Sequence, residues 1–286
     1  MTDNVTLVND SYNYIEFESY FLQYEYYQKV NFIMHVVTCI IISISLPLML
    51  MTIYALFSLV RKDHEAPIYV INLLISDLIQ LCCMLIVETK LDQTIVYDIY
   101  SCGLWISVDF MVCVSLERYL IIAHPLWYRF KRTIKNSVVV SVVAWLIPPV
   151  FFLTVFPWFT FDVAGSIFAI FLILPFLLFI FFLVGTLRAL SASVSVPSEE
   201  KQRIVGILVL VLLIYTLLFL PSIILFLNMN NRSDRTLTDL AFMFAKLSPL
   251  ADLILYVFFR KASISKLFTT VNCCRVANTD TNISTV

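Results

Sequence analysis

The stretch GSIFAIFLILPFLLFIFFLVGTLRALSA, residues 165–192, has no charged side chain before Arg188. A helix needs about 20 mainly apolar residues to cross the hydrocarbon core of a bilayer, and this run exceeds that length. Of the 286 residues in the chain, 60% are hydrophobic and 14% are charged, whereas soluble domains carry roughly 25% charged residues. The composition therefore predicts a membrane protein and excludes an ordinary soluble fold.

Six further apolar runs of spanning length predict an all-α protein, a seven-transmembrane helix bundle. The expected spans are 31–60, 67–87, 94–123, 134–158, 165–192, 203–228 and 238–259. We assign residues 1–30 to an extracellular N-terminal tail and 31–259 to the seven-transmembrane domain. Residues 260–286 are expected to form a short amphipathic cytoplasmic helix and a tail. The chain has no internal repeat of the kind from which many transporters are built.

The distribution of basic residues predicts the orientation, because cytoplasmic loops carry an excess of lysine and arginine. Of the 19 such residues, 14 fall on one side of the predicted spans, 4 on the other and one, Lys246, within a span. The N-terminus is therefore expected outside a multi-pass plasma-membrane protein. The first 30 residues lack the apolar core of a cleaved signal peptide. Asn4 and Asn9 begin N-x-S/T sequons, which are glycosylation acceptors on the outer side.

Charged groups inside a bilayer are costly and by default mark a functional interior. Near the inner end of the third span, Glu117-Arg118-Tyr119 is followed by Pro125-Leu126 and by Tyr128. This pattern resembles the E/D-R-Y…P-L-x-Y signature of rhodopsin-like (class A) G-protein-coupled receptors. The resemblance implies that a heterotrimeric G protein is engaged by the residues Glu117, Arg118, Tyr119, Pro125, Tyr128, Arg129 and Arg132.

Two more motifs follow in the family's order. Asp77 resembles the helix-two aspartate, and the run from Asp252 to Tyr256 is similar to N/D-P-x-x-Y. Ser248 shares a helix face with Asp252, and the resemblance adds Ser107 to a sodium pocket around these residues. Two carboxylates placed close together must share a proton or hold a cation. We therefore expect sodium or a proton here, with plain interhelical hydrogen bonding as the alternative, and no other cofactor.

The sixth span carries a likeness to the family's F-x-x-C-W-x-P switch. In the run from Tyr215 to Pro221, Phe219 stands in place of the tryptophan. A proline within a spanning helix frees backbone groups and bends the helix. The resemblance assigns Phe219 and Pro221, together with Asp252 and Tyr256, to an activation switch.

Candidate ligand-pocket residues are Glu88, Tyr100 and Lys246. Lys246 lies where opsins bind retinal, but the cysteine bridge and much of the opsin pattern are absent, so an acid such as Glu88 or a ligand's anion is the expected partner. The run from Asp252 to Tyr256 and the short loops resemble the branch of nucleotide, lysolipid and proton-sensing receptors. Tyrosines beside acids in residues 10–27 resemble the sulfated N-termini of peptide receptors. The ligand class stays open among lipid, nucleotide, proton and peptide.

The C-terminal tail carries two modification or docking motifs. Cys273 and Cys274 are expected to be palmitoylated, which pins the tail to membrane lipid. Ser284-Thr285-Val286 fits the ending that PDZ domains bind, with the carboxylate of Val286 captured. No nucleic-acid partner is expected.

Four positions depart from the family pattern. Met49, Gln93, Leu253 and Leu183 stand where the family has asparagine, the disulfide cysteine, proline and tyrosine. Two functions therefore stay open: a receptor that signals to G proteins, and a non-signalling or weakly coupled relative that acts as a decoy, scavenger or dimer partner. The chain has no paired metal-ligand histidines and no nucleophile motif, so a transporter or an enzyme is disfavoured.

Overall fold

The computed structural model describes residues 3–60, 68–89, 93–131, 133–155, 158, 161–192, 198–227 and 235–258. Its helices are α1 (Asp3–Val60), α2 (Ile68–Glu88), α3 (Gln93–Ala123), α4 (Pro125–Lys131), α5 (Ile134–Val155), α6 (Phe161–Ala192), α7 (Ser198–Leu227) and α8 (Arg235–Lys246). After a turn at Leu247, the chain is helical again over 248–258. The described part of the chain is thus helical almost throughout.

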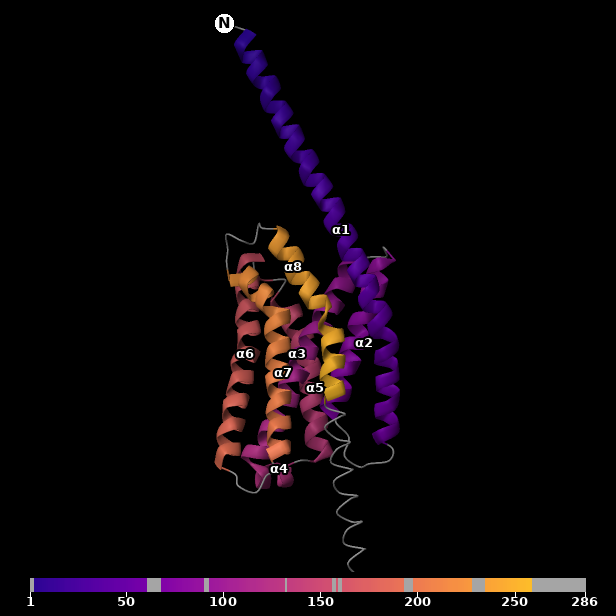
Figure 1. The fold of residues 1–286 in the computed structure, drawn as a ribbon, viewed down its shortest axis with the longest axis vertical. Coiled ribbons are helices and arrows are strands. Elements are labelled where there is room, and N and C mark those ends of the chain that lie inside the picture. The colour runs from indigo at the N-terminus through magenta and orange to yellow at the C-terminus, as the bar shows by residue number, and fades with distance from the viewer. Residues whose placement is uncertain are drawn as a thin grey trace, which may run out of the picture.

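Seven helical segments are long and apolar enough to cross a membrane, which confirms the predicted all-α bundle. They are Tyr24–Leu56, Ile68–Glu88, Ile95–Ala123, Ile134–Thr154, Ser166–Ser191, Lys201–Leu227 and Thr236–Phe258. The first helix begins earlier than the sequence pattern indicated, because no glycine or proline precedes Pro47 to interrupt it. The N-terminal part of α1 projects away from the bundle (Figure 1).

The seventh span is broken into two helical pieces next to a proline. Pro249 has no N–H to donate to the carbonyl of Ala245, and its ring clashes with that carbonyl. The backbone instead closes a tight turn, in which Leu247 N–H donates to Phe244 O at 3.1 Å. Pro249, which accounts for the break, lies four residues, about one helical turn, before Leu253, the position at which the family pattern has its proline.

The helix α3 lies at the centre of the bundle. It packs against α2, α5, α6 and α7, while α1 packs against α2 and α8. The short helix α4 lies at one end of the bundle, below α3 in Figure 1, and α8 begins at the other. We call the first the Arg118 end and the second, where α2 finishes, the Glu88 end.

The bundle faces lipid with apolar side chains and keeps its few polar groups inside. Leu153, Ile170 and Leu213 are exposed, while Phe110 and Met111 of α3 are fully buried. Because lipid is as apolar as the core, polar contacts between helices contribute to their association. One such contact joins α5 to α2, where Trp145 Nε1 donates to Asn72 Oδ1 at 2.9 Å.

Candidate functional site

A group of polar side chains, the interior polar cluster, lies between α2, α3 and the helix over 248–258. Its members Asp77, Gln80, Ser107, Ser248 and Asp252 are each 0% exposed. The Asp77 and Asp252 carboxyl groups lie close enough to interact directly. Two carboxyl groups are thus held together in the middle of an apolar bundle.

Gln80 joins this cluster to the backbone of α3. Its Nε2 donates to Asp77 Oδ1 at 3.1 Å and to the carbonyl oxygen of Gly103 at 3.4 Å. A Cβ atom at Gly103 would come within 3.1 Å of Gln80 Cγ, so the glycine allows this close approach. Gln80 is absent from the sequence prediction, although its position three residues after Asp77 places it on the same helix face.

Several oxygen atoms of the cluster have no hydrogen bond of good geometry to the described residues. They are Asp77 Oδ2, Gln80 Oε1, Ser248 Oγ and both carboxyl oxygens of Asp252. Each buried unsatisfied polar group costs about 1–3 kcal/mol. The predicted member Ser107 donates to the carbonyl oxygen of Leu104 at 2.9 Å and so is satisfied by its own helix. The remaining oxygens form a set that suits a proton or a small hard cation.

At the Arg118 end, the predicted coupling residues connect α3 to α4 and α6. Tyr128 of α4 donates its hydroxyl to Glu117 Oε1 at 2.6 Å. Pro125 is the first residue of α4, a position that tolerates its missing N–H. Arg129 lies in α4, but its side chain is outside what the structure describes, and Arg132 lies outside the described residues.

The Tyr119 ring fills the space between α3 and α6. It stacks on Phe182 at a centroid distance of 5.7 Å and contacts Phe181 at 5.8 Å. A Cβ atom at Gly185 would lie only 2.6 Å from Tyr119 Cε2. Gly185 therefore positions Tyr119 at this end of the bundle. The sequence gives no signal for this role, because it does not show that Tyr119 of α3 lies next to Gly185 of α6.

A cavity of about 310 Å³ opens between α3, α5, α6, α7 and α8 in the half of the bundle toward the Glu88 end. Its lining is mostly aromatic and aliphatic, including Trp105, Phe168 and Phe219, and the side-chain polar groups in it are hydroxyls and the Trp105 indole N–H. The residues that line it are Tyr100, Ser101, Leu104, Trp105, Val108, Phe152, Phe168, Leu172, Phe219, Ser222, Leu225, Phe226, Thr238, Ala241, Phe242 and Ala245.

Of the three candidate ligand residues, Tyr100 lines this cavity. Glu88 and Lys246 lie outside its lining. Glu88 contacts His35 of α1, and Lys246 Nζ donates to Thr38 Oγ1 at 3.0 Å. Lys246 is nonetheless in electrostatic range of the Glu88 carboxylate, so the two charges lie in one neighbourhood at the Glu88 end.

The predicted switch residues include one that lines the cavity, Phe219, and one that belongs to the interior polar cluster, Asp252. Phe219 lines the cavity and packs on Tyr215 with ring centroids 4.8 Å apart. The Tyr215 hydroxyl donates to the carbonyl oxygen of Leu172 at 2.6 Å, in the turn that precedes Pro175 of α6. Pro221 follows within α7, and the more distant switch residues Asp252 and Tyr256 are buried. Tyr215 thus links the proline-containing helices α6 and α7, a role that the sequence pattern does not reveal.

Three sets of predicted sites are not described by the structure. Asn4 and Asn9 lie in α1, but their side chains are not described. Cys273, Cys274 and Val286 lie outside the described residues. Glycosylation, palmitoylation and PDZ binding therefore stay predictions.

No protein-family model matches the chain. It is 30% identical over 135 residues to G-protein coupled receptor 68 of Homo sapiens, which covers 41% of this chain and 36% of that protein. It is 27% identical over 233 residues to proteinase-activated receptor 2 of Rattus norvegicus, covering 66% of this chain and 57% of that receptor. G-protein coupled receptor 65 of Homo sapiens is 24% identical over 135 residues, which cover 42% and 39% of the two chains. The chain spans less than two thirds of the length of each of these relatives.

These relatives are receptors, and the seven helices of spanning length agree with that likeness. Separate receptors match different lengths of the chain, so the likeness does not depend on one short segment. The chain is similar to G-protein-coupled receptors over part of its length, and its motifs resemble the rhodopsin-like (class A) pattern.

Proposed function

We propose that this receptor binds a small lipid-like ligand in the apolar cavity and transmits its occupancy to a heterotrimeric G protein at the Arg118 end. The single observation that carries the proposal is the cavity itself. Its volume of about 310 Å³ lies within the range of roughly 300–1,000 Å³ that is typical of ligand pockets. It lies against α3, the helix that also carries the coupling residues Glu117, Arg118 and Tyr119.

The lining of the cavity favours a lipid over a nucleotide. Phosphate groups are bound in proteins by charge-assisted hydrogen bonds from arginine or lysine, and the described residues that line the cavity include neither. The hydroxyls of Tyr100 and Ser101 suit the neutral polar part of an otherwise apolar ligand. The aromatic rings of Trp105 and Phe168, 5.5 Å apart, suit an acyl chain.

A route from the cavity to the Arg118 end runs along α7 and α6. A ligand that presses on Phe219 also bears on Tyr215, which is bonded to the turn before Pro175. Because a ligand shifts a two-state equilibrium only through its different affinity for the two states, this contact has to differ between them. We expect the Tyr215 hydrogen bond to be present in one state and broken in the other.

The interior polar cluster supports a second part of the proposal, that sodium or a proton occupies it in the inactive state. Replacing Na⁺ with choline should raise ligand-independent signalling of the wild type and leave Asp77→Asn unchanged, because the variant has lost one carboxylate. Plain hydrogen bonding between helices predicts instead that the wild type ignores both Na⁺ and pH.

The main experiment measures G-protein activation by the receptor in lipid nanodiscs against a panel of lysophospholipids and fatty acids. Ala241→Phe fills the cavity, and Val143→Phe adds the same ring on an exposed position of α5. A lipid response that survives in Val143→Phe and disappears in Ala241→Phe supports the proposal. Equal responses of the two variants would place the ligand elsewhere.

Arg118→Ala tests the coupling half separately. We expect it to abolish nucleotide exchange on the G protein while labelled lipid still binds.

Phe219 in place of the family tryptophan and Leu253 in place of the proline favour the second candidate function, a weakly coupled relative. That function predicts lipid binding without exchange in the wild type, and no difference between wild type and Arg118→Ala.

A further inference from the structure

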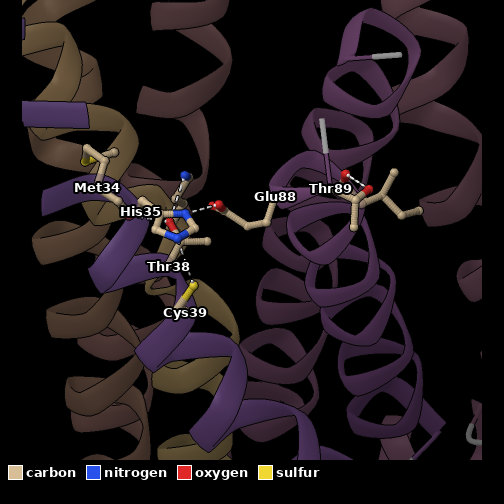
Figure 2. A network of polar contacts seen from close by, with 8 residues as sticks. Met34, His35, Thr38, Cys39, Glu88 and Thr89 are labelled. Carbon is tan, nitrogen blue, oxygen red and sulfur yellow. Dashed lines mark hydrogen bonds and ion pairs between the residues drawn. The ribbon is translucent and has the colours of Figure 1, made fainter. Parts of the chain in front are cut away.

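Three side chains with metal-ligating atoms meet between α1 and α2 toward the Glu88 end. They are His35 and Cys39 of α1 and Glu88 of α2, and their ligating atoms lie within 4.8 Å of one another. His35 and Cys39 are four residues apart, so both project from one face of α1. Figure 2 shows the imidazole of His35 lying between the Glu88 carboxylate and the Cys39 sulfur. We call these three residues the α1–α2 triad.

The two nitrogen atoms of His35 face different partners. Nδ1 contacts Glu88 Oε2, and Nε2 lies 3.8 Å from Cys39 Sγ. A tetrahedral zinc ion, with bonds of about 2.0–2.1 Å to nitrogen and about 2.3 Å to sulfur, holds two such atoms about 3.6 Å apart. The separation between Nε2 and Sγ is therefore close to what one bound ion needs.

We propose that His35 Nε2 and Cys39 Sγ bind a divalent transition-metal ion of the zinc class, while Glu88 accepts a hydrogen bond from Nδ1–H. The carboxylate fixes the tautomer and the orientation of the ring and makes Nε2 a better donor to the metal. Imidazole and thiolate select zinc-like ions over Mg²⁺ and Ca²⁺, which prefer oxygen. The Cys39 thiol releases its proton to solvent when the metal–sulfur bond forms, and water completes the coordination.

The triad lies on the outer surface of the bundle, near the end of α2. The side chain of His35 is 56% exposed and that of Glu88 is 20% exposed, and Cys39 is partly exposed. Glu88 is the last residue of α2, so its carboxylate lies where the span ends and water is near. An ion from the aqueous phase can thus reach the site without crossing the apolar core.

A bound ion would stabilise the place where three helices meet. Glu88 connects α2 to α1 through His35, and Lys246 of α8 donates to Thr38, the residue before Cys39. By holding the His35 ring in place, the ion strengthens the contact between α1 and α2. We expect micromolar zinc to raise the melting temperature of the receptor without any ligand in the cavity.

Cobalt is the probe for direct ligation, because a cobalt–thiolate bond absorbs in the near ultraviolet. The parent receptor for this test carries Cys273→Ser and Cys274→Ser, which remove the paired thiols of the tail. It is reduced and then reconstituted in nanodiscs. Addition of Co²⁺ should produce the thiolate charge-transfer band, and Zn²⁺ should abolish it by displacement. Cys39→Ser and His35→Ala should lack the band, whereas Cys82→Ser, which removes an exposed cysteine of α2, should retain it.

Glu88→Gln tests the supporting carboxylate and should weaken cobalt binding about 10- to 100-fold, as for other residues that orient a metal-bound histidine. A parent receptor without the band, or an undiminished band in Cys39→Ser, would overturn the proposal. An ordinary His35–Glu88 ion pair without metal predicts the first of these results. The parent receptor alone shows whether cobalt binds through a thiolate, so this part of the test does not depend on whether every variant folds. No step depends on the lipid ligand or on the G protein.

Discussion

At the scale of single residues, the contact between Gly185 and Tyr119 determines how closely α6 approaches α3. A methyl group at Gly185 would lie 2.6 Å from Tyr119 Cε2, so Gly185→Ala has to push the ring off Phe182 or separate the helices. Overpacking of this kind typically costs about 1–3 kcal/mol. We expect a lower melting temperature in nanodiscs and reduced G-protein activation, because Tyr119 adjoins Arg118.

Gly206 provides the matched control for this prediction. A Cβ atom there has no atom within 4 Å, and alanine is the better helix former by about 1 kcal/mol. Gly206→Ala should therefore melt at or slightly above the wild-type temperature. If Gly185→Ala behaves in the same way, the close approach of α6 to Tyr119 is not a constraint on the bundle.

The sequence predicted the role of a residue when that role depends on the residue's own helix, and missed it when the role depends on a partner in another helix. Asp77, Ser248 and Asp252 are polar residues in apolar runs, and such residues are conspicuous in the sequence because burying them is costly. Gln80 and Tyr215 were missed because their partners, Gly103 O and Leu172 O, are backbone atoms of other helices. The contact of Glu88 with His35 could not be predicted either, since hydropathy does not give the rotation of a helix about its axis.

At the scale of helices, one hydrogen bond connects α5 to α2. Trp145 Nε1 donates to Asn72 Oδ1 at 2.9 Å, and Asn72 Nδ2 donates to the carbonyl oxygen of Ile68 at 2.8 Å. Trp145→Phe keeps an aromatic ring near Phe110 but leaves the Asn72 oxygen without its donor. An unsatisfied partly buried acceptor should cost about 1–3 kcal/mol, measured as a fall in thermal stability.

A double-mutant cycle separates this hydrogen bond from the packing of the ring. Once Asn72→Leu has removed the acceptor, Trp145→Phe should cost clearly less than it does in the wild type, with a coupling of about 0.5–3 kcal/mol. Additive effects of the two substitutions would mean that the bond contributes nothing and that packing alone joins α5 to α2.

The helices themselves were largely predictable, and their ends were less so. A span has to satisfy every backbone polar group inside the bilayer, so long apolar runs can hardly be anything but helices. The fourth span was predicted to reach Trp158, whereas α5 ends at Val155. The break at Leu247 was not predicted, although Pro249 accounts for it locally, because a proline within an apolar span can also be accommodated by a bend without a break.

At the scale of the whole molecule, the seven spans leave an even choice between two orientations, and charge decides between them. The Arg118 end carries the larger share of lysine and arginine, which the positive-inside rule assigns to the cytoplasm. Of the four N-x-S/T sequons, those at Asn4, Asn9 and Asn231 then lie outside, whereas Asn282 falls in the C-terminal tail on the cytoplasmic side. We expect the receptor made in mammalian cells to lose apparent mass when its N-linked sugars are removed enzymatically, and the triple asparagine-to-glutamine variant to show no such loss.

An engineered sequon supplies the opposite test of orientation. Residues 193–197 connect α6 to α7 on the side that should be cytoplasmic. A sequon inserted into a lengthened version of this connection should therefore carry no sugar. Glycosylation there, together with unmodified Asn4 and Asn9, would show that the orientation is the opposite one. Arg118 would then lie outside the cell, where no G protein can reach it. The same result would put the α1–α2 triad on the cytoplasmic side, so that an ion would have to reach it from the cytoplasm. Orientation therefore decides coupling and metal access together, because the two sites lie at opposite ends of one bundle.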